Sequence, residues 1–218
     1  MAPPASGPHI IRGRLVYLRP AERADLPKFV KWLNDAGTAW FLALRAPLSM
    51  ALEERWFERT VERFGTDVYH FAICRVADDR PIGTIGLELL DTVNGNAALG
   101  IVVGEEEDRG AGYGTDAVNA LVDFGFGELR LERIWLDVYE GNDRALRSYE
   151  KAGFAREAVL RRAAFHRGEH LDVIRMAILR DEWSALERPK AWDYGITDRA
   201  RAGQEPAAAD RSSPGTAR

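Results

Sequence analysis

The chain has 218 residues, a hydrophobic share of 46% and a formal net charge of −4. A chain of this size and composition can bury the core of one domain, and its acidic balance argues against a polyanion such as duplex nucleic acid as the main partner. A single cysteine, Cys74, excludes an internal disulfide and most cysteine-rich metal sites. No apolar run approaches the ~20 residues that cross a bilayer. We therefore expect a cytoplasmic protein that binds no nucleic acid, membrane or metal.

Both ends of the chain differ in composition from the middle. Residues 1–9 are rich in proline and small side chains, and residues 195–218 show no apolar periodicity. We expect a flexible arm at 1–9, one domain at 10–194 and a disordered tail at 195–218.

The first half of the domain alternates between strand and helix patterns. The run 14–20 predicts a strand, and Asp25 and Ser49 are placed to cap the two helices that follow. The first helix is expected to bury Leu26, Phe29, Val30 and Leu33. The second helix is expected to bury Leu52, Phe57, Val61 and Phe64. Strand patterns separated by turn residues then cover 68–76, 81–90 and 97–104.

The second half opens on an acidic turn, 104–108, which is expected to be solvated, and on a glycine-rich loop, 108–117. The helix after the loop is expected to bury Val118, Leu121, Val122 and Phe124. A strand at 133–139, a short helix that ends at Gly153 and a late strand at 170–179 complete the pattern. The alternation indicates a mixed α/β domain built on one central sheet.

The glycine-rich loop has the pattern of a phosphate-binding site. Gly110, Gly112 and Gly114 alternate in it, and glycine is favoured where a ligand lies against bare backbone or where φ is positive. The free N–H groups of such a loop and the dipole of the following helix attract a phosphate. A Walker P-loop is excluded because no lysine lies near Thr115. A dinucleotide-binding loop fits weakly, and a tight turn without a ligand is the remaining alternative.

Residues 109–114, “RGAGYG”, resemble the acetyl-CoA pyrophosphate loop of the GCN5-related N-acetyltransferases (GNATs). Further along, “NDRALRSYEKAGF” at 142–154 matches the Asn, Ala, Tyr and Gly-Phe spacing of that family's next helix. The resemblance runs from “GRLVYLRPAERADL” to “VIRMAILRDEW”. It is closest to the branch with ribosomal-protein N-terminal acetyltransferases and spermidine acetyltransferases. It implies a mostly antiparallel central sheet, flanked by helices, with a splayed acetyl-CoA cleft.

The resemblance also implies which residues hold acetyl-CoA. The strand backbone at Ile101, Val102 and Val103 would pair with the pantetheine arm, and an N–H of Val102 or Val103 would support the thioester oxygen. The pyrophosphate would be bound by Arg109, Gly110, Ala111, Gly112, Tyr113, Gly114 and Thr115. Asn142 is expected to bind the CoA arm, to cap the next helix, or both. No metal is implied.

Tyr149 is the side chain that the resemblance places beside the departing sulfur. A phenol with a pKa of ~10 can give a proton to the CoA thiolate. Periodicity alone would place Tyr149 with Leu146 on the apolar stripe of a short helix.

The general base has no clear counterpart. Many family members carry a glutamate on the strand before the loop, where this chain has Ala97, Ala98 and Leu99. Glu88, on the preceding strand, is the catalytic candidate, acting through water or by binding a cationic acceptor, with a solvated strand residue as the alternative. His70 is a second candidate, for a proton relay.

The sequence thus predicts transfer of an acetyl group from acetyl-CoA to a primary amine, by direct attack in a ternary complex. A site without a strong base slightly favours a protein N-terminal α-amine, with a pKa near ~8, over a side-chain amine near ~10.4. The alternatives are a small-molecule amine, such as a polyamine, amino sugar or amino acid, and a non-catalytic CoA-binding module. A homodimer is left open.

Overall fold

A sheet of eight strands runs through the computed structural model, which describes residues 11–42 and 44–194. Its strands are β1 (Ile11–Arg12), β2 (Val16–Pro20), β3 (Tyr69–Arg75), β4 (Pro81–Asp91), β5 (Asn96–Val103), β6 (Arg133–Tyr139), β7 (Ala155–His166) and β8 (Glu169–Leu179). They lie in the order β1-β2-β3-β4-β5-β6-β8-β7, and every neighbouring pair is antiparallel except β5 with β6. The predicted mixed α/β domain with a mostly antiparallel sheet is confirmed. The arm predicted at 1–9 and the tail predicted at 195–218 lie outside the described residues.

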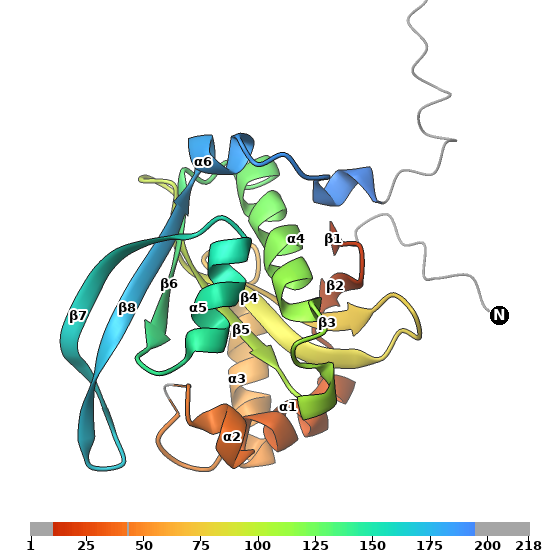
Figure 1. Cartoon of the computed structure of the whole chain (residues 1–218). Helices are drawn as coiled ribbons and strands as arrows, with labels where there is room; N and C mark the ends of the chain where they lie inside the picture. The colour runs from red at the N-terminus through yellow and green to blue at the C-terminus, as the bar shows by residue number, and fades with distance from the viewer. Residues whose placement is uncertain (1–10, 43, 195–218) are drawn as a thin grey trace, which may run out of the picture.

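Helices cover both faces of the sheet (Figure 1). They are α1 (Leu26–Leu33), α2 (Ala36–Ala39), α3 (Met50–Arg63), α4 (Tyr113–Gly127), α5 (Asp143–Lys151) and α6 (Arg180–Ser184). Successive strand residues point to opposite faces. In β3, Phe71 and Ile73 join the core under α4, whereas Ala72 and Cys74 pack with α1 on the other face. None of the helices in the described part of the chain is long and apolar enough to span a bilayer.

The orientation predicted for α3 is wrong for three of its four residues. Its N-terminal cap is as expected, since Ser49 Oγ accepts the backbone N–H of Leu52 at 3.3 Å. However, Leu52, Val61 and Phe64 are 48%, 56% and 39% exposed. Phe57 packs against the cluster around α1 as predicted, and Trp56 packs beside it. The inward face of the helix is set by these contacts, and the Trp56 indole lies edge-on to His70 of β3.

The β7–β8 hairpin extends beyond the rest of the sheet. β6 pairs with β8 only as far as Tyr139 and Val173, whereas β7 and β8 stay paired to His166 and Glu169. The free end of the hairpin comes down beside α2 (Figure 1). The hairpin and the α2 segment therefore flank the same end of the sheet.

Candidate active site

A gap between β5 and β6 forms the centre of the site. The two strands pair only at Asn96 with Arg133, Ala97 with Ile134 and Ala98 with Trp135. Both then continue without pairing, to Val103 and Tyr139. A cleft of about 1100 Å³ occupies the space between them and is lined by residues from α2, β5, the glycine loop, α5 and β7.

The backbone of β5 presents amide groups to this gap. Gly104 donates its N–H to the carbonyl of Ile82 on β4, at 2.8 Å. Amide directions alternate along an extended strand, so the amides of Ile101 and Val103 point away from β4, toward the gap. The amide and carbonyl groups of Val102 point toward β4. A Cβ added to Gly83 of β4 would collide with the Val102 carbonyl oxygen. The expectation that the Val102 amide supports the thioester oxygen is therefore wrong, and Val103 is the candidate.

The glycine loop has the geometry of a phosphate cradle. Gly110 and Gly112 have φ values of +81° and +90°, and α4 begins directly after them at Tyr113. The first N–H groups of a helix have no partner within it, and the space beside Gly110 is open for 4 Å. Gly110, Gly112, Gly114 and Thr115 line the cleft.

Arg109 is placed differently from its predicted role at the phosphate. Ala111 and Tyr113 are not among the residues that line the cleft, and a phosphate contact through their backbone amides stays a prediction. Arg109 does line the cleft, but its guanidinium donates to Thr38 Oγ1 and to the carbonyl of Gly104, both at 2.6 Å. Arg109 thus braces α2 against the end of β5 and has little freedom left to follow a phosphate.

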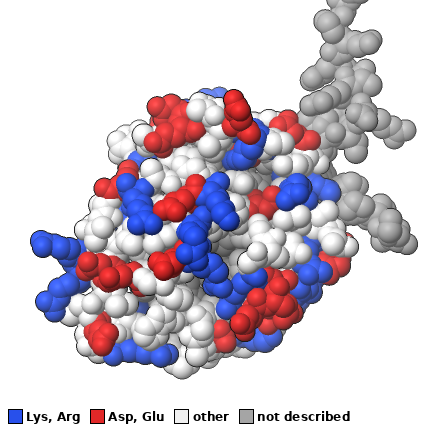
Figure 2. All heavy atoms as spheres, in the orientation of Figure 1, with Lys and Arg blue, Asp and Glu red and all other residues white. Residues whose placement is uncertain are grey.

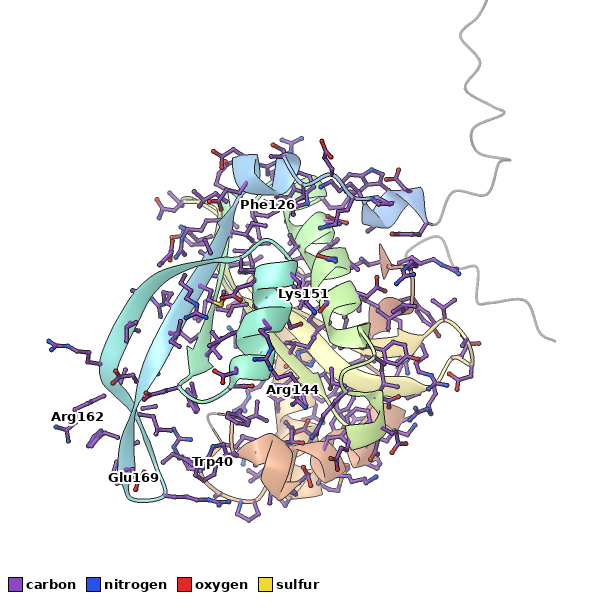
Figure 3. The ribbon with its side chains drawn as sticks, in the orientation of Figure 1. Trp40, Phe126, Arg144, Lys151, Arg162 and Glu169 are labelled. Carbon is purple, nitrogen blue, oxygen red and sulfur yellow. The ribbon has the colours of Figure 1, made fainter. Side chains whose placement is uncertain are left out.

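Three cations that the sequence analysis missed lie on α5. Arg144, Arg147 and Lys151 line the cleft and have no ion pair among the described residues. Arg144 and Lys151 project from α5 over the cleft (Figure 3), and Lys and Arg side chains form a band across this face (Figure 2). The i, i+3, i+7 spacing of Arg144, Arg147 and Lys151 puts them on one helix face, and this spacing was the signal available in the sequence. They can attract the phosphates of CoA.

Asn142, at the start of α5, has one of the two roles expected for it. Its Oδ1 accepts the N–H of Ala145 at 3.2 Å, which caps the helix. Asn142 also lines the cleft, so its amide nitrogen remains available to a ligand. Thr115 Oγ1 and Ser148 Oγ lie 2.8 Å apart, which joins α4 to α5 across the site.

Tyr149 lies where a proton donor is needed. It lines the cleft, and its ring packs on Phe154 with the centroids 5.9 Å apart. Burial raises the pKa of the Tyr149 phenol well above its ordinary value. The hydroxyl therefore keeps its proton at neutral pH and can donate it.

The two candidates for the base lie outside the cleft. Glu88 is exposed and pairs with Ala98, at the closed end of the gap where β5 and β6 are still joined. His70 is half-buried under α3, with both ring nitrogens shielded from solvent and its ring edge-on to Trp56 at 4.7 Å. None of the described residues that line the cleft is a histidine or a glutamate. The structure does not bring a carboxylate or imidazole base to the site from these positions.

The prediction that the acidic turn at 104–108 is solvated is wrong for two of its residues. Asp108 is only 2% exposed, and its carboxylate accepts from Arg80 at 2.7 Å. Glu105 accepts from Lys31 at 2.6 Å and from the indole of Trp32 at 3.0 Å. The turn therefore fixes the glycine loop to α1 and to Arg80, directly before β4.

Comparison with known proteins agrees with this geometry. Residues 15–155 match the family described as Acetyltransferase (GNAT) domain. The chain belongs to the GNAT family. As a GNAT enzyme it is an acetyl-CoA-dependent N-acetyltransferase.

Individual relatives cover most of the GNAT domain. The chain is 31% identical to the probable N-acetyltransferase YjcK of Bacillus subtilis, over 70% of this chain and 87% of that protein. It is 28% identical to spermidine N(1)-acetyltransferase of Escherichia coli, over 78% and 89% of the two chains. The structure of spermidine N-acetyltransferase from Vibrio cholerae with CoA and spermine superposes with a TM-score of 0.73, at 25% identity over 78% and 98%.

Proposed function

We propose that this GNAT enzyme transfers the acetyl group of acetyl-CoA directly to the primary amine of a small molecule, with both substrates bound together. The observation that carries the proposal is the unpaired gap between β5 and β6. Its exposed amides suit a pantetheine arm that lies along β5 as an added strand. The cradle at Gly110 to Gly114 and the cations of α5 take the phosphates.

Each step of the transfer has a group in the cleft to assist it. The amine nitrogen attacks the thioester carbonyl carbon, and the N–H of Val103 stabilises the negative charge that develops on the oxygen. The carbon–sulfur bond breaks, and Tyr149 protonates the departing thiolate. The amine loses its proton to water, because the described cleft-lining residues include no histidine or glutamate and the two aspartates among them, Asp108 and Asp137, are each paired with an arginine. Tyr149 then regains a proton from solvent.

The contact between the α2 segment and the β7–β8 hairpin supports a small acceptor. Trp40, directly after α2, lies edge-on to His166 of the β7–β8 hairpin at 4.7 Å, and the guanidinium of Arg167 lies 4.6 Å from the Trp40 ring. Figure 3 shows Trp40 at the free end of the hairpin. These contacts join the segment after α2 to the hairpin, and their chain neighbours Phe41 and Phe165 line the cleft. The two spermidine acetyltransferases to which the chain is similar, by name, act on small amines.

A protein N-terminus is the second candidate acceptor. It is favoured by the lack of a base, since an α-amine with a pKa near ~8 is partly deprotonated at neutral pH.

A cytoplasmic location and a homodimer also stay predictions. Light scattering on the purified protein tests the dimer.

The test is an acceptor screen that follows release of the CoA thiol and identifies acetylated products by mass spectrometry. Small amines and peptides with free N-termini form its two arms. Turnover confined to the small amines supports the proposal, and turnover confined to the peptides refutes it. Tight acetyl-CoA binding without turnover in either arm would indicate a non-catalytic CoA-binding module.

A further inference from the structure

The acceptor end of the cleft combines an apolar wall with a positive charge. Its side chains come from the segment after α2 and from the β7–β8 hairpin. The apolar members are Phe41, Leu42, Leu160, Ala163 and Phe165. Arg45 lines the same region. This composition is unlike a site that binds a cation.

Both carboxylates that the described residues bring to the cleft are already paired. Asp137 accepts from Nε and Nη2 of Arg175, at 2.8 Å each. Asp108 accepts from Arg80 at 2.7 Å and is 2% exposed. A polycationic acceptor would have to displace an arginine from one of these pairs or stay without a counter-charge. The cleft therefore disfavours a polyamine.

Arg45, in contrast, has neutral partners. Its guanidinium donates to the carbonyl of Leu42 at 3.2 Å and to the hydroxyl of Tyr139 at 3.3 Å, and it lies 6.0 Å from the Tyr139 ring centroid. No ion pair of Arg45 is formed within the described residues. An arginine offers five N–H donors in a fork that matches a carboxylate or a phosphate. The charge of Arg45 is thus available to an anion.

The position of Tyr139 places this anion site in the same cleft as the reaction. Tyr139 ends β6 on one side of the gap and Val103 ends β5 on the other, and both residues line the same cleft as Arg45. An anion on Arg45 would therefore share the cleft with the thioester that the Val103 amide faces. We infer that the acceptor is a small amine that also carries a carboxylate or a phosphate, which Arg45 binds. This inference rests on the proposed acetyl transfer to a small amine.

The experiment compares amines that differ only in the anionic group. Phenylalanine is paired with phenethylamine, and O-phosphoethanolamine with ethanolamine, while spermidine serves as the polycation. We expect the anionic member of one pair to have a kcat/KM at least 10-fold above its partner, and spermidine to be the poorest substrate. The favoured pair identifies the anion as a carboxylate or a phosphate.

Variants then assign the preference to one side chain. Arg45→Gln should raise KM for the anionic amine about 10- to 100-fold and leave the neutral amine within about twofold. Arg45→Lys should recover part of the loss, because it restores the charge without the fork. Arg162→Gln is the matched control, since Arg162 points outward from the hairpin (Figure 3), and it should change neither amine.

Equal rates within both pairs, or a preference that Arg45→Gln does not change, would overturn the inference and leave acetyl transfer to small amines standing. If no amine is acetylated, the proposed function fails, and calorimetry still tests the inference. N-acetylphenylalanine and N-acetylphosphoethanolamine are then titrated into CoA-loaded protein. Binding that Arg45→Gln abolishes supports the anion site, and no binding of either compound overturns it.

Discussion

Replacing Tyr149 by phenylalanine removes one hydroxyl and little else. The ring keeps its packing on Phe154, and the hydroxyl makes no hydrogen bond to the described residues, so no partner is left unsatisfied. The cost in folding free energy should be below about 1 kcal/mol. If the phenol protonates the thiolate, kcat should fall by about 10² to 10⁴. This loss corresponds to about 3–5 kcal/mol of transition-state stabilisation.

The assay is kcat from thiol release with the best acceptor, together with the Kd of acetyl-CoA from calorimetry. The Kd should stay unchanged, because the hydroxyl acts only when sulfur leaves. An acetyl donor whose thiol has a lower pKa should show a smaller loss in Tyr149→Phe, since a weaker base needs less protonation. Tyr17→Phe, on β2 and outside the cleft lining, is the control. A kcat within twofold of the parent would show that water protonates the sulfur.

Three further predictions concern the cofactor and the base. In Gly114→Val the new side chain begins 3.5 Å from Val103 at the cradle, so the Kd of acetyl-CoA should rise at least about 10-fold with a folded circular dichroism spectrum; an unchanged Kd contradicts the cradle. The double change Arg147→Gln and Lys151→Gln should weaken acetyl-CoA binding about 10-fold and flatten its salt dependence, which titrations at several ionic strengths measure; an unaltered salt slope contradicts a phosphate contact. In Glu88→Gln the pH profile of kcat/KM should overlay that of the parent and follow the pKa of the amine, and a lost limb would restore Glu88 as the base.

The sequence predicts the elements whose signals are local. The strands at 69–75, 81–91, 96–103 and 133–139 follow apolar runs that are bounded by turn residues. The cap at Asn142 and the positive φ of Gly153, +96°, depend on nearby residues alone and were predicted correctly. Neighbours along the chain decide such features, so no knowledge of the fold is needed.

Features decided by distant residues were not predicted. The inward face of α3 depends on its contacts with α1 and with His70 of β3, and the helix periodicity does not contain that information. β7 was not predicted at all, because it is an edge strand exposed on both faces and lacks apolar alternation. In the site, Arg45 and Tyr139 meet across 94 positions of sequence. The base candidates failed for the same reason, since only the sheet register shows that Glu88 lies at the closed end of the gap.

His70, the other base candidate, should instead affect stability in acid. Burial under α3 lowers the pKa of His70 to about 4, and its two ring nitrogens have no partner among the described residues. In the unfolded chain a histidine has a pKa of ~6.5, so the unfolded state binds about one more proton than the folded state between those two values. The neutral ring thus contributes stability that is fully present above pH ~6.5 and is lost as pH falls toward 4. The loss amounts to about 3 kcal/mol over this window. His70→Phe, which keeps an aromatic ring beside Trp56, should flatten the dependence of unfolding free energy on pH there by about 1.4 kcal/mol per pH unit. Urea unfolding at several pH values measures this slope, with His170→Phe on the exposed hairpin as the control. Equal slopes in parent and His70→Phe would mean that His70 titrates normally, and its exclusion as a proton relay would have to be reconsidered.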